Sequence, residues 1–173
     1  ARCLDCRAMI PLDVVNAMAH GDFVETFGDI AEHSPWVAET AAADRPFADR
    51  RAMVAAFAGS VQSAAPGAKL ALLCAHPDLA GKAAMTDDST REQAGAGLDA
   101  LTPEEFERFT AMNDAYKTKF EFPFIFAVKG ADKFQILEAF EERLENSRER
   151  EFDTACAQVC RILRFRIEDR VAP

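Results

Sequence analysis

The first candidate for chemistry is His76, one of three histidines in the chain, which stands directly before Pro77 in the stretch HPDLAGK. A residue that precedes proline is driven out of the α region, so a helix that reaches this point must end there. The imidazole then lies on restrained backbone at a helix C-terminus, beside Asp78, and its reference pKa near neutrality suits proton transfer. An alternative needs no ligand, because the ring can simply cap its own helix. Both interpretations stay open at this point.

The second candidate is Arg166. It continues an apolar stripe on a predicted C-terminal helix, whose earlier members step by four, three and four residues: Phe152, Cys156, Val159 and Leu163. A guanidinium on a buried stripe needs an anionic partner. That partner is either an internal aspartate or glutamate, or a substrate carboxylate held by two parallel hydrogen bonds.

Two further stretches carry polar groups that packing alone does not explain. The segment 122–128, FPFIFAV, is typical of a short extended piece for which no other segment is a clear strand partner. Its buried amides and carbonyls must bond to helix ends, side chains and water, or to a ligand with its own donors and acceptors. In STREQAGAGL, Ser89, Glu92 and Gln93 lie around one turn of a short predicted helix. Glu92 is therefore a candidate, with an ordinary surface carboxylate as the alternative.

Composition narrows the class of partner. The chain has 173 residues and a formal net charge of −9, which argues against nucleic acid or an anionic membrane as a partner. It contains no apolar run of the roughly 20 residues that a membrane span needs. We therefore expect a cytoplasmic protein with reduced cysteines. The pairs Cys3/Cys6 and Cys156/Cys160 make a poor zinc site, and we predict no metal.

The elements that must position these residues are helices, because helical spacing recurs while the alternation of half-buried strands is nearly absent. We predict an all-α protein: a single-domain bundle of about seven to eight helices with a short extended segment near 122–128. The expected helices cover 11–20 (closed by Gly21), 22–32, a stretch that starts at the N-cap Ser34, a stretch after Asp49, 67–75, a short helix near Ser89, 103–120 with Thr102 as its cap, 131–146, and 148–170 with Ser147 as its cap. Residues 1–8 are expected to be a disordered extension, and 9–173 the helical domain.

The motifs themselves resemble those of the 2-oxo-4-hydroxy-4-carboxy-5-ureidoimidazoline decarboxylase family of urate breakdown. The matching stretches are SPWVAE at 34–39, HPDLAGK at 76–82, EQAGAGL at 92–98, NDAYKTKFEFPFI at 113–125, FPFIFAV at 122–128, RLEN at 143–146 and RI at 166–167. They occur in the family's order, and the resemblance extends over nearly the whole chain from Met9. It implies a helical, usually dimeric decarboxylase domain that uses no cofactor and forms (S)-allantoin by losing carbon dioxide and adding a proton on one face.

The resemblance also implies roles for individual residues. His76 would be the acid/base, Glu92 would belong to the catalytic set, and Arg166 would face the substrate carboxylate or a neighbouring oxygen. The implied substrate-binding residues are Pro77, Ser89, Thr90, Arg91, Gln93, Phe124, Ile125, Phe126, Ala127 and Val128. On this interpretation His76 and Arg166 share one cavity. Two alternatives stay open: a hydrolase of a related ureido compound, in which His76 activates water, and a non-catalytic helical interaction module.

Overall fold

Helices make up the regular structure of this protein. The computed structural model describes residues 9–81 and 85–173. Across those two ranges it contains nine α-helices and one short 3-10 helix, and its only β-type pairing is an isolated bridge between Ile10 and Val171. The prediction of an all-α protein is confirmed. The predicted N-terminal extension and Lys82 lie outside the described residues.

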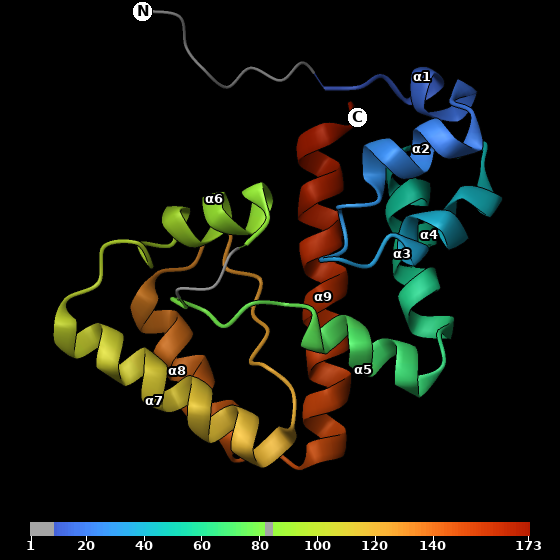
Figure 1. The fold of residues 1–173 in the computed structure, drawn as a ribbon. Coiled ribbons are helices and arrows are strands. Elements are labelled where there is room, and N and C mark those ends of the chain that lie inside the picture. The colour runs from blue at the N-terminus through green and yellow to red at the C-terminus, as the bar shows by residue number, and fades with distance from the viewer. Residues whose placement is uncertain (1–8, 82–84) are drawn as a thin grey trace, which may run out of the picture. The chain divides into compact units, whose positions relative to one another are not determined.

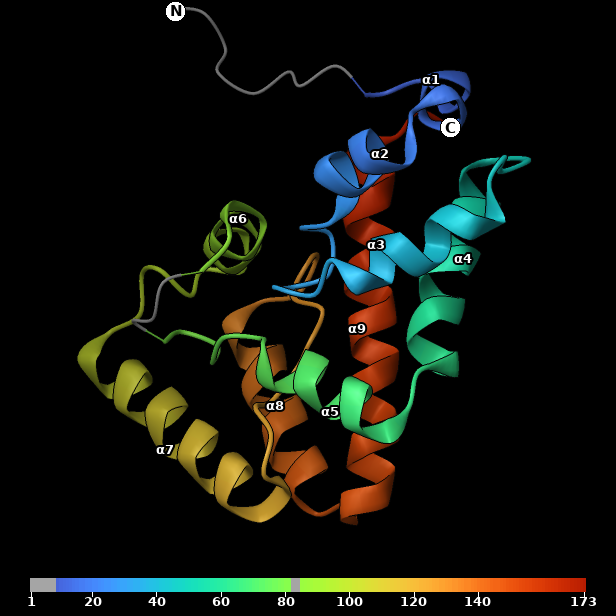
Figure 2. The same ribbon diagram turned by 45° about the vertical axis from the view of Figure 1, so that its right-hand side comes forward.

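The helices follow one another along the chain as Figures 1 and 2 show. They are α1 (Leu12–Ala17), α2 (His20–Phe27), α3 (Trp36–Ala41), η1 (Ala42–Asp44), α4 (Arg50–Ser63), α5 (Pro66–Cys74), α6 (Asp87–Gly95), α7 (Pro103–Phe120), α8 (Lys133–Leu144) and α9 (Arg148–Arg170). They form two compact units. The terminal unit contains the described residues up to Ser63 together with Ile162–Pro173, and the central unit contains those of Ala64–Arg161. That the whole chain is one domain stays a prediction.

Aromatic side chains form the core of the terminal unit. The ring of Phe23 lies 5.0 Å from that of Phe27 and 6.2 Å from those of Phe47 and Phe57, measured between centroids. Both phenylalanines of α2 are fully buried. The guanidinium of Arg45 lies over the face of Phe23, 4.7 Å from its centroid, so this arginine covers the aromatic cluster.

The first two helices are shorter than their spacing predicts. The predicted range 11–20 is wrong, because Met18 is extended (φ −60°, ψ 140°) and ends α1 at Ala17. Gly21 does not close that helix but lies inside α2, which begins at His20. The reason is long-range: Arg45 Nη1 donates a hydrogen bond to the carbonyl of Met18 at 2.6 Å. A distant side chain thus satisfies the end of α1, which no local pattern reveals.

The predicted range 22–32 is also too long, since α2 ends at Phe27. Gly28 is the C-cap, and a Cβ placed there would lie only 2.5 Å from the Val24 carbonyl oxygen. The predicted N-cap role of Ser34 is wrong too. Its hydroxyl donates to the Glu32 carbonyl at 2.9 Å, and α3 begins at Trp36.

The start signals of the later helices are confirmed. Thr102 and Glu105 form the predicted capping box of α7, and the Ser147 hydroxyl accepts the Arg150 N–H at 3.3 Å at the start of α9. Asp132 and Gln135 form a second capping box, which starts α8 at Lys133 rather than at 131. The helix α5 matches its predicted range closely.

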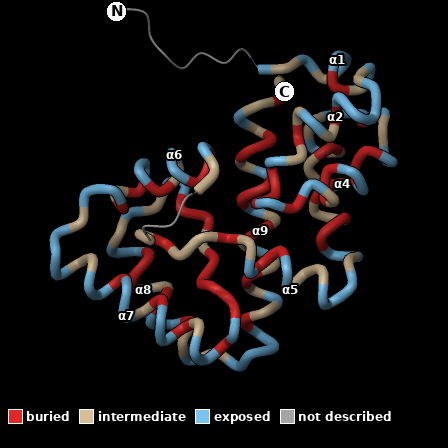
Figure 3. The backbone as a smooth tube through the Cα atoms, viewed as in Figure 1, coloured by how far each residue is buried: buried red, intermediate tan, exposed pale blue. Residues whose placement is uncertain are grey.

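The core of the central unit surrounds Tyr116 of α7, which is fully buried. Its ring lies 4.5 Å from that of Phe120 and 5.2 Å from that of Phe124, and Phe124 stacks on Phe140 of α8 at 3.6 Å, all between centroids. The segment 122–128 therefore enters this core between the end of α7 and the start of α8, and Figure 3 colours most of it as buried.

Candidate functional site

His76 lies just beyond α5, where the proline places it. The residue is 8% exposed, and its Nδ1 lies 2.8 Å from the Leu72 carbonyl oxygen, four residues back on the helix. A carbonyl oxygen only accepts, so Nδ1 carries the proton in this contact. The capping interpretation is therefore correct for one ring nitrogen. Nε2 is then the basic nitrogen of the neutral ring, and the proton-transfer interpretation applies to that atom.

The loop that follows His76 is held by side chains from two other helices of the central unit. Lys117 Nζ of α7 pairs with the Asp78 carboxylate at 2.5 Å, and Asn113 Nδ2 donates to the Leu79 carbonyl at 2.8 Å. Gln93 Oε1 of α6 accepts the N–H of Ala80 at 2.9 Å. Asn113 is itself buried. These contacts fix the backbone immediately after the imidazole, and they give Gln93 a structural role beside its predicted substrate contact.

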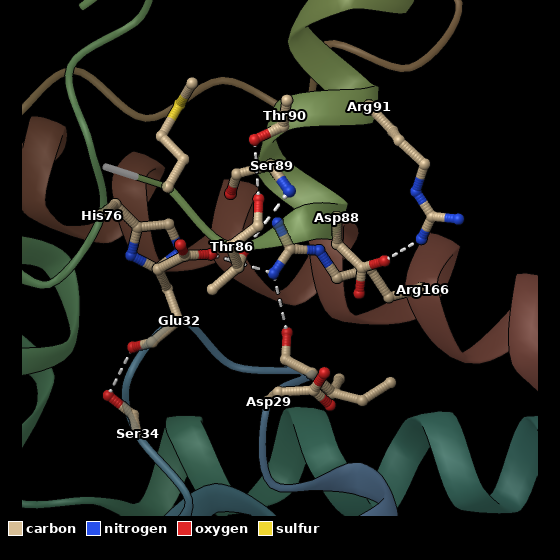
Figure 4. A network of polar contacts seen from close by, with 12 residues as sticks. Asp29, Glu32, Ser34, His76, Thr86, Asp88, Ser89, Thr90, Arg91 and Arg166 are labelled. Carbon is tan, nitrogen blue, oxygen red and sulfur yellow. Dashed lines mark hydrogen bonds and ion pairs between the residues drawn. The ribbon is translucent and has the colours of Figure 1, made fainter. Parts of the chain in front are cut away.

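The predicted short helix is α6, and its residues divide between two faces. Ser89 and Gln93, four residues apart, are buried, and Glu92 is half-buried. Thr90 and Arg91 are exposed: the Thr90 hydroxyl donates to the Thr86 carbonyl at 3.0 Å, and Arg91 pairs with Asp88 (Figure 4). Ser89, Glu92 and Gln93 are therefore better placed to line a buried site than the two residues between them.

Part of the backbone of the segment 122–128 has hydrogen-bond partners within the protein. Arg143 Nη1 of α8 donates to the Ile125 carbonyl at 2.7 Å, and Gln158 Oε1 of α9 accepts the N–H of Ala127 at 2.9 Å. The carbonyl of Val128 accepts the N–H of Ala131 at 3.0 Å. Side chains and a turn thus satisfy three of the segment's polar groups.

Arg143 belongs to a buried polar network that the sequence analysis did not identify. Glu151 is 0% exposed and accepts hydrogen bonds from Arg143 Nε (3.0 Å), from Asn146 Nδ2 (2.8 Å) and from the Tyr116 hydroxyl. Burial, together with the hydrogen bond to Glu151, raises the pKa of Tyr116 well above its usual range. A signal was present: Arg143 follows Ile136 and Phe140 at steps of four and three, the same pattern that marks Arg166.

Arg166 has an internal partner within the terminal unit. Its Nη1 lies 3.1 Å from Glu32 Oε2 and donates to the Ile30 carbonyl at 3.1 Å (Figure 4). Arg166 is 3% exposed and Glu32 is 0% exposed. Of the two partners that the sequence left open, the internal carboxylate is therefore present. His76 and Arg166 belong to different units, and their sharing of one cavity stays a prediction.

Two observations on the part of the chain that the structure describes concern clusters of metal-ligating side chains and long apolar helices. No cluster of three or more potential ligands occurs there. Burial raises the pKa of the Cys156 and Cys160 thiols, which disfavours the thiolates that would bind zinc. The pair Cys3/Cys6 lies outside the described residues. None of the described helices combines the length and the apolar character that crossing a bilayer requires.

Comparison with known proteins decides the family. The family model described as OHCU decarboxylase matches residues 16–168. The chain belongs to the OHCU decarboxylase family. The 2-oxo-4-hydroxy-4-carboxy-5-ureidoimidazoline decarboxylase of Halalkalicoccus jeotgali is 44% identical over 151 residues, which are 87% of this chain and 86% of that protein. That of Haloferax volcanii is 41% identical over 161 residues, covering 93% and 96% of the two chains.

Solved structures agree with this assignment. A crystal structure of (S)-allantoin synthase superposes on this chain with a TM-score of 0.77 at 31% identity, covering 94% of this chain and 54% of that one. A crystal structure of OHCU decarboxylase in the presence of (S)-allantoin gives a TM-score of 0.69 at 20% identity, over 83% and 94% of the two chains, which shows a shared fold. Membership of the OHCU decarboxylase family makes this chain a carboxy-lyase.

Proposed function

We propose that this enzyme decarboxylates 2-oxo-4-hydroxy-4-carboxy-5-ureidoimidazoline to (S)-allantoin in urate degradation. The observation that carries the proposal is the family match over residues 16–168, together with an imidazole whose Nδ1 bonds to the Leu72 carbonyl at the end of α5. The names of the relatives in Halalkalicoccus jeotgali and Haloferax volcanii supply the substrate, and the (S)-allantoin synthase structure supplies the product.

The reaction needs charge stabilisation and one proton delivered to one face. The bond between the ring carbon and the carboxylate breaks, carbon dioxide leaves, and the electron pair moves into the adjacent carbonyl or imine of the substrate. A carbon atom of the substrate ring then receives a proton. Because the substrate supplies its own electron sink, we propose that no cofactor takes part.

In this proposal His76 carries the proton through Nε2. The bond from Nδ1 to the Leu72 carbonyl fixes the tautomer and the ring plane, and the contacts to Asp78, Leu79 and Ala80 fix the backbone behind it. A proton donor that is held in this way delivers to one face only, as a stereospecific product demands. Pro77 contributes because α5 cannot continue through His76 into a proline, and the helix ends at Cys74.

The remaining predicted site residues enter as contacts to the substrate. We propose that Glu92 belongs to the catalytic set, either holding the ureido group or assisting His76, and that Ser89 and Gln93 line the ligand from the buried face of α6. Thr90 and Arg91, which lie between these two residues on the same turn of α6, would also contact the substrate. We also propose that Arg166 contacts the substrate carboxylate or its neighbouring oxygen. The existing pair with Glu32 means that the substrate must share this guanidinium or displace Glu32 from it.

Three further features complete the proposal, and only the dimer rests on the family resemblance. We propose that the enzyme is a homodimer, that it is cytoplasmic and that it has no nucleic-acid partner. The net charge of −9 agrees with the last point, because nucleic acid requires a basic surface. Analytical ultracentrifugation of the purified chain tests the dimer directly.

The decisive experiment measures the circular dichroism of allantoin formed from urate, with the two upstream enzymes present and this protein added or withheld. The expected result is an (S)-allantoin signal that depends on this protein, together with released carbon dioxide. His76→Asn is the informative variant, because the asparagine amide can still donate to Leu72 while it cannot replace Nε2. It should fold normally and give no (S)-allantoin signal above the background. Normal turnover by a folded His76→Asn protein would refute the role of His76, and product without carbon dioxide would favour a hydrolase.

A further inference from the structure

Two side chains bond to consecutive peptide groups of the segment 122–128. Arg143 of α8 holds the Ile125 carbonyl, and Gln158 of α9 holds the Ala127 N–H, at 2.7 Å and 2.9 Å. One residue, Phe126, lies between these two anchored groups. All five residues belong to the central unit, so the arrangement is independent of the terminal unit.

Peptide geometry then fixes the direction of the polar groups of Phe126. In a planar trans peptide the C=O of one residue and the N–H of the next point in opposite directions. Arg143 on the Ile125 carbonyl therefore turns the Phe126 N–H away from α8, and Gln158 on the Ala127 N–H turns the Phe126 carbonyl away from α9. Residues 123–128 form no helix or turn. An extended residue presents its own N–H and C=O on the same side, so an extended Phe126 would direct both groups together to the opposite face.

Solvent exposure also distinguishes Phe126 from the rest of the segment. Phe126 is half-buried, whereas every other residue from Phe122 to Val128 is buried. The anchoring side is also rigid. Arg143 is held by Glu151, which is fully buried, so the guanidinium that bonds to Ile125 has little freedom to move.

We propose that Arg143 and Gln158 are positioning residues, which hold the two peptide groups around Phe126 so that its N–H and C=O form a single donor–acceptor pair facing the substrate. Such a pair matches a group that offers an N–H beside a C=O, as the ureido arm and the cyclic amide of the proposed substrate both do. This inference rests on the proposed function. It assigns recognition of the amide group to one residue of the segment, and it gives two residues outside the site the task of orienting it.

Gln158 provides the test, because it is half-exposed and lies outside the buried charge network. Gln158→Met keeps the length of the side chain and removes the acceptor, while Gln158→Glu keeps an acceptor oxygen. Gln135→Met is the matched control, since Gln135 Oε1 also accepts a backbone N–H, that of Asp132 in the α8 capping box. The assay measures kcat and KM for freshly generated substrate with each purified protein.

Gln158→Met should raise KM by about threefold to tenfold, the worth of one hydrogen bond, and leave kcat within about twofold. Gln158→Glu should restore most of the wild-type KM, and Gln135→Met should change neither constant. Unchanged KM in Gln158→Met, or an equal rise in Gln135→Met, would overturn the proposal. Absence of turnover in the wild-type protein would instead refute the proposed function, so the two failures are distinguishable.

Discussion

The buried network around Glu151 makes a quantitative prediction about stability. Its carboxylate is fully buried and accepts hydrogen bonds from Arg143 Nε, from Asn146 Nδ2 and from the Tyr116 hydroxyl, and it forms an ion pair with Arg143 Nη2 at 2.9 Å. Glu151→Gln keeps the shape of the side chain but removes the charge and turns an amide N–H toward at least one of these donors. Arg143 is then left as a buried cation without its counter-charge.

Removing one partner of a buried ion pair costs about 3–5 kcal/mol of unfolding free energy. Glu141→Gln is the matched control, because Glu141 pairs with Arg108 on the surface, where the two side chains are 57% and 55% exposed. An exposed pair of this kind contributes about 1 kcal/mol or less. The same substitution of glutamine for glutamate should therefore give two clearly different results in one protein.

Urea denaturation followed by circular dichroism measures the difference. With a slope of about 2 kcal/mol per molar urea, Glu151→Gln should lower the midpoint by about 1.5–2.5 M, and Glu141→Gln by no more than about 0.5 M. Equal midpoints for the two variants would refute the reasoning. Such a result would mean that the Arg143 guanidinium finds another partner or that water reaches it.

Two further predictions concern groups that the structure places in ion pairs or buries. Arg166→Met and Glu32→Gln should each lower the unfolding free energy by about 3 kcal/mol or more, because each breaks a buried ion pair. If Arg166 also contacts the substrate, Arg166→Met should lower kcat/KM far more than Glu32→Gln when both proteins are assayed well below their melting temperatures. Equal losses of kcat/KM would mean that Arg166 serves only as the partner of Glu32. Tyr116 is the chain's single tyrosine, and its pKa is raised by burial, so its stabilising contribution is complete below about pH 10 and is lost as the pH rises further. Urea midpoints should therefore fall less steeply above pH 10 in Tyr116→Phe than in the wild-type protein, and parallel curves would contradict this.

Local signals predicted the later helices well and the first ones poorly. The helix α7 begins where Thr102, Pro103 and Glu105 indicate, because a capping box satisfies its own end within four residues. The end of α1 depends instead on Arg45, about thirty residues away, whose side chain bonds to the Met18 carbonyl. Spacing alone cannot reveal a partner of that kind, since it is chosen by tertiary structure.

The same distinction applies to the candidate site. Because Pro77 ends a helix, the position of His76 just beyond α5 could be predicted from the sequence. The apolar stripe on the last helix likewise predicted that Arg166 is buried and needs an anionic partner. The identity of that anion, Glu32, depends on a loop between α2 and α3 that carries no regular pattern. Arg143 satisfies the same stripe rule on α8, after Ile136 and Phe140, so its burial and its need for an anion were equally predictable from sequence.

The hydrogen bond between His76 Nδ1 and the Leu72 carbonyl has a consequence for how sequences of this family are interpreted. One half of the ring contributes to folding whether or not the other half takes part in catalysis. A descendant that had lost the enzymatic activity would still benefit from retaining a histidine at this position. Its presence in a newly sequenced gene therefore identifies the fold more securely than it identifies a working enzyme.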